Sequence, residues 1–324
     1  MRPLQKTVAV RDKRFLLRVE TSHESADYRM YEDLREEIWG YPDDHMSSTR
    51  NMMCENVFHE GGSLFIGAFA EGDDGSFGPD GTHLVGFCYG FVGIRDKEVG
   101  FRTPANLRFY AQYAGVRKAY QSYGLGILLK EYQRDMVRDL LGVSTIICTY
   151  DPLTGVNARR NIHHFGADVL EYRVATYGEY GGFLNRPDVP TDRFLLSWDL
   201  GKTKARPGYD LNAAMAAPPT IRVGMRRVEG RNGKLDLEVV EGTNPGADGD
   251  ILLVRIPIDF YRMLQETDVP DDRVRRIPVD WRVVSRDVFQ ALFARGYRIV
   301  DFRKAQADAP ENSYVLLRNV PANR

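Results

Sequence analysis

The run V-R-K-A-Y-Q-S-Y-G-L-G at 116–126 has the residue types of a turn that binds an anion. It stands between a predicted strand and a predicted helix, and Gly124 and Gly126 let its main chain bend tightly and approach a ligand. The N–H groups at the start of the following helix point at one spot, where the helix dipole favours negative charge. The run predicts a diphosphate site, and the alternative is a simple entry turn into the helix.

The other common phosphate-binding motifs do not occur in the sequence. There is no G-x-x-x-x-G-K-[ST] run, so a P-loop nucleotide fold is not supported. A dinucleotide-binding fingerprint would stand early in a strand–helix–strand unit. Here the glycines follow three strands of antiparallel type, which is a different context.

Cysteine and histidine give no indication of a metal site. Cys54, Cys88 and Cys148 form no C-x-x-C pair, which argues against a disulfide framework and a thiolate zinc site. Cys88 and Cys148 lie in apolar runs and are predicted to be buried small residues. His163 and His164 are neighbours on a predicted helix, where adjacent side chains point ~100° apart. We therefore expect a surface or partly packed pair and no bound metal.

Hydrophobic patterns predict the elements around the loop. Apolar residues recur every three to four positions at 25–39 and at 127–141, which indicates two helices. Their apolar faces consist of Tyr28, Tyr31, Leu34, Ile38 and Trp39 in the first, and Leu128, Leu129, Tyr132, Met136 and Leu140 in the second. Further helices are expected at 43–58 and 155–165, and strands at 15–20, 62–70, 82–94, 106–116, 145–152, 169–178 and 193–200. The turn-forming run at 71–81 predicts an antiparallel hairpin.

The charge of the whole chain limits its partners. Its 324 residues include 44 basic and 45 acidic side chains, a formal net charge of -1. This balance argues against a nucleic-acid or anionic-membrane partner, because both attract a surplus of Lys and Arg. The N-terminus lacks the apolar core of a signal peptide, and no apolar stretch reaches the ~18–20 residues that span a bilayer. We expect a soluble, cytoplasmic protein.

The loop and its context resemble the GNAT superfamily of acyl-CoA-dependent N-acyltransferases. Those proteins carry [QR]-x-x-G-x-[GA] five residues after a strand-ending Val, which Val116 and Gln121 match. The order of predicted elements from 15 to 200 also fits. The run D-P-L-T-G-V-N-A-R-R-N-I-H-H-F-G-A and the later L-N-R-x-x-x-P-T-D-R are similar to a bacterial branch with a C-terminal extension. The resemblance implies an α/β fold of α+β type with a mixed, splayed central sheet.

The resemblance also implies an acyl-CoA co-substrate, acetyl-CoA or another. In the superfamily the fourth and fifth strands separate, and the pantetheine arm lies in the gap. Carried onto this chain, the main chain at Ala114 to Val116 would pair with pantetheine and polarise the thioester carbonyl. Asn157 would contact the cofactor arm, or would instead cap a helix. The pyrophosphate would be held by the amides of Gln121, Ser122, Tyr123, Gly124, Leu125 and Gly126.

The implied catalytic residues depart from the family pattern. The strand at 106–116 offers no acidic residue, only Gln112 with Tyr110 and Tyr113, and the usual general-acid Tyr falls at Ile162. Tyr177 is the nearest substitute along the chain. Asp151 ends the fifth strand, where an acceptor amine would arrive, and is expected to act as the base or to form the turn before Pro152.

The acceptor is expected to be a primary amine of a small metabolite such as an amino acid. Arg186 and Arg193 lie in the segment that borders the acceptor site in this superfamily, and a guanidinium could bind a carboxylate there. Asp192 and Arg193 could equally brace the loop. Two other functions stay open, a non-catalytic acyl-CoA sensor or scaffold and an enzyme that acetylates peptides or proteins. The C-terminal extension favours a covered site for a small substrate.

The sequence predicts a GNAT domain at 1–200, a linker at 201–218 and a smaller α/β unit at 219–324. Strands are expected near 236–240 and 251–256, and a helix at 285–295. Residues 166–173 (GADVLEYR) align with 296–303 (GYRIVDFR), which predicts that the last unit repeats the second half of the GNAT domain without its glycine loop. Chance similarity is the alternative. The repeat would cover the acceptor site or form the interface of a homodimer.

Overall fold

The structure is a computed structural model, and its chain divides into two compact units. The first consists of Met1–Cys148 with Asp199–Lys202, and the second of Thr149–Trp198 with Thr203–Arg324. Residues 149–198, which the sequence places in the first domain, thus pack with the C-terminal part of the chain. The described residues are 3–22, 24–40, 62–78, 80–178, 182–201, 208–306 and 310–318.

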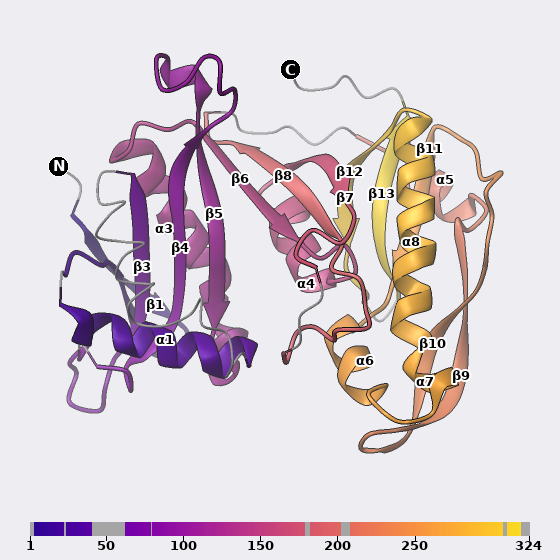
Figure 1. The fold of residues 1–324 in the computed structure, drawn as a ribbon, viewed down its shortest axis with the longest axis horizontal. Helices are drawn as coiled ribbons and strands as arrows, with labels where there is room; N and C mark the ends of the chain where they lie inside the picture. The colour runs from indigo at the N-terminus through magenta and orange to yellow at the C-terminus, as the bar shows by residue number, and fades with distance from the viewer. Residues whose placement is uncertain are drawn as a thin grey trace. The chain divides into compact units, whose positions relative to one another are not determined.

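The first unit is built on a mixed sheet with the order β1-β2-β3-β4-β5-β6 (Figure 1). Neighbouring strands from β1 to β5 are antiparallel, whereas β5 and β6 are parallel. The predicted mixed α/β fold and the predicted hairpin are therefore confirmed, and β1 is an additional edge strand. The strands are β1 (Gln5–Val10), β2 (Lys13–Val19), β3 (Ser63–Ala70), β4 (Leu84–Ile94), β5 (Leu107–Val116) and β6 (Thr145–Tyr150), with a 3₁₀ turn η2 (Pro104–Asn106) before β5.

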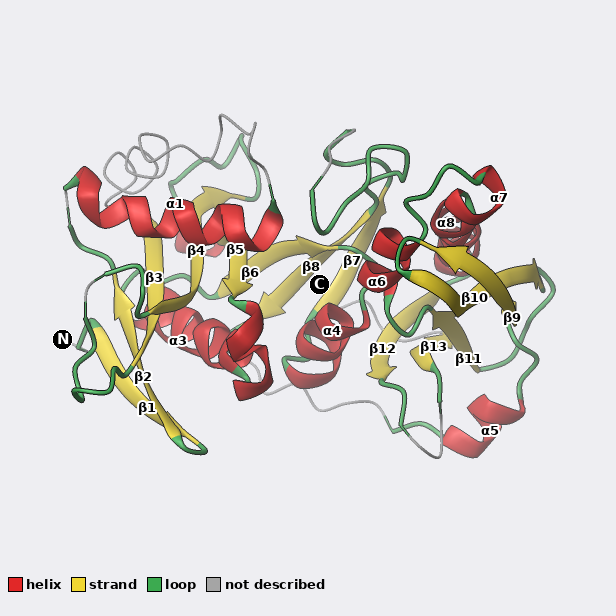
Figure 2. Cartoon of the chain, turned by 90° about the horizontal axis from the view of Figure 1, so that it is seen from below, coloured by secondary structure: helices red, strands yellow, loops and turns green. Residues whose placement is uncertain are grey.

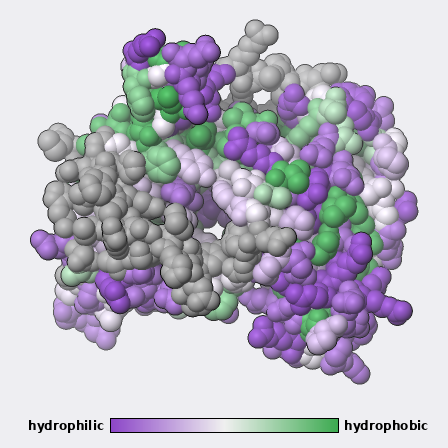
Figure 3. Space-filling view, viewed as in Figure 1, coloured by the Kyte–Doolittle hydropathy of each residue, from purple (hydrophilic) through white to green (hydrophobic). Residues whose placement is uncertain are grey.

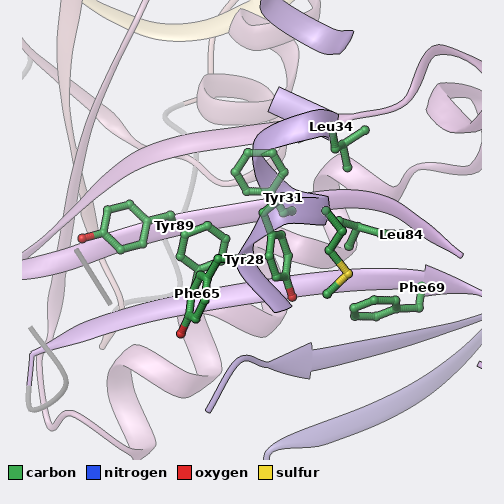
Figure 4. Packing of buried hydrophobic residues seen from close by; sticks show 9 residues of the cluster. Tyr28, Tyr31, Leu34, Phe65, Phe69, Leu84 and Tyr89 are labelled. Carbon is green, nitrogen blue, oxygen red and sulfur yellow. The ribbon is translucent and has the colours of Figure 1, made fainter. Parts of the chain in front are cut away.

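Two long helices, α1 (Ser25–Trp39) and α3 (Leu125–Asp139), lie on opposite faces of this sheet (Figure 2). The predicted apolar face of α1 is buried in an aromatic core with β3 and β4, where the rings of Tyr31 and Phe65 lie 4.7 Å apart (Figure 4). In α3 the buried residues include Leu129 and Met136, as predicted. Leu140 is exposed, because the helix ends one residue before it. The helix predicted at 43–58 lies outside the described residues.

The second unit begins with a short α4 (Gly155–Ala158), which continues as a π-helix η4 (Arg159–His164). Two antiparallel strands follow, β7 (Asp168–Arg173) and β8 (Arg193–Asp199). The strand predicted at 169–178 ends at Arg173, because Ala175 adopts a positive φ of 45° that no strand residue has. The sequence therefore overestimates the length of β7.

The rest of the second unit contains a two-stranded and a three-stranded sheet. The predicted linker at 201–218 includes a short helix whose Ala214 is buried, and the helix predicted at 285–295 begins earlier, at Ile277. The three-stranded sheet has the order β11-β13-β12. The elements are α5 (Leu211–Ala216), β9 (Ile221–Gly230), β10 (Gly233–Thr243), β11 (Ile251–Ile256), α6 (Phe260–Glu266), α7 (Asp272–Arg275), α8 (Ile277–Ala294), β12 (Tyr297–Arg303) and β13 (Asn312–Arg318).

Two hairpins of the second unit share an irregularity. In β7–β8 the register shifts between Val169 and Glu171, and in β12–β13 it shifts between Ile299 and Asp301. These positions are equivalent when 166–173 is aligned with 296–303, and Gly166 and Gly296 both have positive φ. The order of strand, helices and two strands in the C-terminal residues is the order that the sequence predicts.

The described surface is mixed in character. On the face in Figure 3, hydrophilic side chains predominate and hydrophobic patches are small and separated. Within the described residues, no helix is long and apolar enough to cross a membrane.

Candidate functional site

Strands β5 and β6 pair only over a short stretch. Phe109 faces Ile146 and Tyr110 faces Ile147 in parallel register, but β5 continues to Val116. Over 111–116 the other edge of β5 still pairs with β4. In the described chain, the edge of β5 on the β6 side has no β6 partner beyond Tyr110. The two strands therefore separate beyond Tyr110.

The pairing of β4 with β5 contains a bulge. Tyr89 faces Tyr113 and Gly90 faces Ala111, so Gln112 is an extra residue in β5, and its side chain is exposed. Bulges redirect side chains and often occur near active sites. The residue that this bulge exposes is a neutral amide, which leaves β5 without an ionisable acid or base there.

The glycine run connects β5 to α3 through a 3₁₀ helix, η3 (Lys118–Tyr123). Gly124 has φ 71° and ψ 12°, a left-handed conformation that favours glycine, and it is the N-cap of α3. Its carbonyl accepts hydrogen bonds from the N–H groups of Ile127 and Leu128 at 2.9 and 3.3 Å. The N–H groups of Leu125 and Gly126 precede these bonds in the helix and face its N-terminal end. The loop therefore has the geometry of an anion site.

The side chains of this loop lie mostly in solvent. Gln121, Ser122 and Gly124 are exposed, and the Gln121 amide donates to the carbonyl of Val116 at 3.1 Å. A Cβ placed on Gly124 would meet no atom within 4 Å. The requirement for glycine at this position thus comes from the main-chain conformation, and the space in front of it is open.

Asp151, in the second unit, is held by an internal network. Its Oδ1 accepts the N–H of Leu153 at 2.9 Å, which is the predicted turn, and its Oδ2 accepts a hydrogen bond from Arg282 of α8. Arg193 lies 3.6 Å from the same Oδ2. The Arg282 side chain is only 1% exposed. Burial alone would lower the pKa of Arg282, but the charge and hydrogen bond of Asp151, together with the nearby Tyr172 and Asp192, outweigh it and the pKa is raised.

Asp192 is the centre of a second buried network. It is fully buried, and Arg286 of α8 donates to both of its oxygens at 2.8 and 2.9 Å. The Tyr172 hydroxyl donates to Oδ2 at 2.8 Å, and the N–H of Ala175 donates to Oδ1 at 2.9 Å. Burial raises the pKa of Tyr172, so the phenol stays protonated and can donate. This arrangement fits the predicted bracing role of Asp192.

Tyr177 lies beside these networks. Its hydroxyl is 2.6 Å from Oγ1 of Thr149, and its ring faces the guanidinium of Arg193 at 5.1 Å. The residue is 45% exposed. The structure therefore brings Asp151, Tyr177 and Arg193 together, three of the residues that the sequence singles out.

Arg186 lies in a different environment. Its Nε donates to Asp188 at 2.6 Å, its Nη1 donates to Thr267 at 2.9 Å, and its Nη2 donates to the carbonyl of Arg275. It is 5% exposed. It borders a pocket of about 330 Å³ whose lining includes Arg231 and Gln265. All three side-chain nitrogens of Arg186 donate hydrogen bonds inside the second unit. Arg186 therefore braces this unit and has no free pair of N–H groups for a carboxylate.

Asn157 is the third residue of α4, three positions after the N-cap Thr154. Its amide donates to Thr154 Oγ1 at 3.0 Å and to the Tyr261 hydroxyl at 3.4 Å, and it accepts from Arg160 at 2.7 Å. The alternative in which Asn157 itself is the N-cap is wrong, because the helix begins before it. The side chain links α4 to α6.

His163 and His164 each contact a neighbouring side chain. His163 Nδ1 lies 2.9 Å from Oδ1 of Asp301, and the His164 ring packs edge-on against Phe165. Among the described residues, no group of three or more His, Cys, Asp or Glu could hold a metal ion. Cys88 is buried as predicted, while Cys148 is only partly buried, and Cys54 lies outside the described residues.

No protein-family model matches the chain, and no curated protein matches it. Among solved structures it is similar to a Desulfovibrio desulfuricans protein assigned to the GNAT family of acetyltransferases (16% identity, 57% of this chain and 99% of that chain, TM-score 0.39). It is also similar to the ribosomal-protein-S5-alanine acetyltransferase from Vibrio fischeri (13%, 62% and 100%, TM-score 0.41). A third is a Salmonella typhimurium protein assigned as an acetyltransferase and solved with its cofactor acetyl-CoA (17%, 60% and 99%, TM-score 0.40).

The chain's own geometry carries the fold assignment. Antiparallel strands lead to β5, which separates from a parallel β6, and the glycine loop and α3 lie between them in sequence. A helix and two antiparallel strands then follow. This order of elements is consistent with the GNAT fold. The separating strands β5 and β6 correspond to the fourth and fifth strands of that fold, and β1 is an additional edge strand.

Sequence reasoning missed Arg282 and Arg286. Both are on α8, four residues apart and therefore on one face of the helix. A pair of arginines four residues apart in this helix was the available indication. Their partners, Asp151 and Asp192, are distant in the chain, so the pairing itself had no local signal.

Proposed function

We propose that this chain transfers an acyl group from acyl-CoA to a primary amine of a small metabolite, such as an amino acid. The observation that carries the proposal is the separation of β5 from β6 directly before a glycine loop that caps α3. An extended arm can pair with the open edge of β5 while its diphosphate meets the N-terminus of α3.

Coenzyme A fits both features chemically. Its pantetheine arm has two amides that can pair with the main chain at Ala114 and Val116. Its pyrophosphate would accept hydrogen bonds from the amides of the loop. We assign the following residues to this contact: Gln121, Ser122, Tyr123, Gly124, Leu125 and Gly126, with Asn157 as a contact of the arm.

The transfer breaks the acyl C–S bond and forms an acyl C–N bond. The amine loses one proton, and the leaving thiolate gains one, so the products are an amide and free CoA. A main-chain N–H of β5 directed at the thioester oxygen would stabilise the charge that develops there. Holding both substrates in place would provide much of the remaining rate enhancement.

We propose Tyr177 as the group that protonates the thiolate. The residue is 45% exposed, and its hydroxyl is hydrogen-bonded to Thr149, which orients it. A positioned acid of this kind contributes ~10²–10⁴-fold to a rate. Tyr177→Phe should therefore lower kcat far more than it changes the affinity for CoA.

Asp151 is better suited to structure than to catalysis. One oxygen accepts a main-chain N–H and the other faces two guanidinium groups, so no oxygen is free to take a proton from an amine. We propose that it anchors Arg193 and Arg282. If Asp151 is instead the base, Asp151→Asn should lower kcat at neutral pH, and the loss should shrink as pH rises and more amine is already neutral.

The second candidate function is a non-catalytic sensor of acyl-CoA. It is favoured by the lack of an ionisable acid on β5 and by the buried Ile162 in η4, where many family members have a tyrosine. An activity matrix of several acyl-CoAs against several amines separates the two functions. Steady release of free CoA with any amine supports the enzyme, and tight CoA binding without release under all conditions supports the sensor.

We further propose that 1–200 is the GNAT domain, followed by the linker at 201–218, and that 219–324 is a partial repeat of it. The equivalent Phe194 and Tyr314 pack against each other, with ring centroids 5.6 Å apart, as expected when two related hairpins meet back to back. The repeat supplies Arg282 and Arg286 to Asp151 and Asp192. Its role would then be to brace residues 149–198, besides covering the acceptor site or forming a homodimer interface.

A further inference from the structure

The pocket beside Arg186 lies inside the second unit and has a volume of about 330 Å³. Three segments line it: residues 182–186, the turn between β9 and β10 at 231–232, and the end of α6 with the residues after it, 264–268. Sites for small molecules have volumes of about 300–1,000 Å³, so a compact ligand fits here. The proposed transfer of an acyl group uses none of these side chains.

Hydrogen bonds tie the three segments together. The N–H of Arg231 donates to the carbonyl of Glu266 at 2.9 Å. Asn232 donates to both carboxylate oxygens of Glu266, through its N–H at 3.2 Å and through its amide at 3.0 Å. On the other side, the Gln265 amide donates to the carbonyl of Phe183 at 3.3 Å. The walls are therefore formed without a ligand, so binding does not have to order them.

Most of the charged groups around the pocket balance one another. Asp188 pairs with both Arg186 and Arg275. Arg275 also pairs with Asp268, so two guanidinium groups and two carboxylates cancel. Arg231 is different, because its guanidinium forms no ion pair within the described residues, and the residue is exposed.

Glu266 does not cancel the charge that remains. Its pKa is lowered, first by the hydrogen bonds from Asn232 and then by the charges of Arg262 and Arg231. Its two oxygens accept from Asn232, and its one negative charge stands beside the two positive charges of Arg231 and Arg262. One positive charge is therefore left over beside the pocket, and a monoanion would balance it.

We infer that this pocket binds a compact carboxylic acid, whose carboxylate contacts Arg231 and whose apolar part contacts Leu264 and Phe183. A guanidinium can hold a carboxylate through two parallel N–H···O bonds. Leu264 is 5% exposed and Phe183 is 57% exposed, so the lining also offers apolar surface. The inference goes beyond the proposed function, because the acid is a second ligand and is neither acyl-CoA nor its acceptor amine.

The test is calorimetric titration of the whole chain with two acids and their uncharged amides. The pairs are N-acetyl-L-leucine with N-acetyl-L-leucinamide, and L-lactate with L-lactamide. The acid of at least one pair should bind at least about tenfold more tightly than its amide, because hydrogen bonds to charged groups are the stronger ones. High salt should reduce this preference, since Arg231 is exposed. Equal affinities within both pairs, or no binding of either acid, would overturn the inference.

Arg231→Ala should remove the preference for the acid without harming the fold, because the side chain is exposed. Gln265→Glu is the second variant. It keeps the shape of the lining and adds a negative charge, so it should weaken binding of the acid by about tenfold and leave the amide nearly unchanged. The matched control is Arg226→Ala, an exposed arginine of β9 outside the lining, which should keep the wild-type preference.

A preference for the acid that persists in Arg231→Ala would mean that the acid binds elsewhere, and the inference would be wrong. No arm of the test contains CoA or measures acyl transfer. A failure of the proposed function would therefore leave this result unchanged, and a failure here would leave the proposed function standing.

Discussion

The glycine loop of the first unit and the ion-pair networks of the second are built in opposite ways. The loop at 117–126 consists of main-chain groups, and its conformation follows from about ten consecutive residues. The networks consist of side chains, and their partners are far apart in sequence, 131 residues for Asp151 with Arg282 and 94 for Asp192 with Arg286. Ligand binding by a site made of main-chain groups should depend on the backbone conformation. The stability of a network made of side chains should depend on each of its ion-pair partners.

The largest effect is expected at Gly124. Gly124→Asp puts a side chain on a residue with φ 71° and adds a negative charge at the N-terminus of α3, opposite a diphosphate. We expect CoA binding to fall below detection in calorimetric titration. The matched control is Gly142→Asp, since Gly142 has a similar φ of 65° and an equally open Cβ position but lies after α3. Both variants bear the same backbone strain, and only the first should lose CoA. Equal affinity in the two folded variants would remove the loop from the site.

The next effect is on stability. Arg282→Met leaves Asp151 buried with only Arg193 nearby, and breaking a buried ion pair costs ~3–5 kcal/mol in the free energy of unfolding. Urea denaturation measures this loss. The control is Arg227→Met, which breaks an exposed pair with Asp236 on the β9–β10 hairpin and should cost at most ~1 kcal/mol.

A double variant tests whether Asp151 and Arg282 stabilise the protein as a pair. Nε and Nη1 of Arg282 have no hydrogen-bond partner in the described chain. The contribution of Arg282 therefore depends mainly on its opposite charge to Asp151. Asp151→Asn combined with Arg282→Met removes both charges and should recover part of the lost stability. Additive losses in the double variant would mean that the two side chains do not act as a pair.

The same contrast explains what the sequence could predict. The loop, α1, α3 and the hairpin of β3 with β4 are set by local patterns, glycine positions and apolar periodicity, and these predictions agree with the structure. Arg186 shows the opposite. Its place in the segment that borders the acceptor site in the superfamily could be read from the sequence, but its three internal partners are residues 188, 267 and 275. Only the folded chain reveals that its donors are already used.

The repeated hairpins add to this comparison. Aligning Pro152 with Pro257, and Arg173–Arg193 with Arg303–Ser313 by register, puts Ile256 where Asp151 is and Ser313 where Arg193 is. The order of elements and the register shift in the hairpin occur in both segments, whereas the charged pair of Asp151 and Arg193 has no counterpart in the second. If 219–324 is the partial repeat that we propose, its backbone pattern has been kept without the charged pair, and the alignment of 166–173 with 296–303 could not show that difference.

A smaller effect is expected on the pH dependence of the free energy of unfolding. Burial raises the pKa of Tyr261, which contacts Asn157, to about 12, against ~10 in an unfolded chain. Below pH 10 the Tyr261 phenol is protonated in both the folded and the unfolded state, and its full contribution to the free energy of unfolding is present. Between pH 10 and 12 the unfolded state loses the proton and the folded state keeps it, so stability falls. From pH 9 to 11, Tyr261→Phe should lose ~1 kcal/mol less than wild type in urea denaturation. Identical losses would show that water reaches this phenol.

The smallest effect is expected at Gln121. Its amide donates one exposed hydrogen bond to the carbonyl of Val116, and the net value of such a bond is ~0.5–1.5 kcal/mol. If the main chain makes the diphosphate site, Gln121→Ala should weaken CoA binding by no more than about tenfold in the titration that tests Gly124→Asp. Ser122→Ala is the control, since its side chain is exposed and should change affinity even less. A loss at Gln121 as large as that at Gly124 would mean that its amide contacts the phosphates directly. The loop would then be a site built from side chains. Substitutions in it should be tolerated as poorly as substitutions in the Asp151 network.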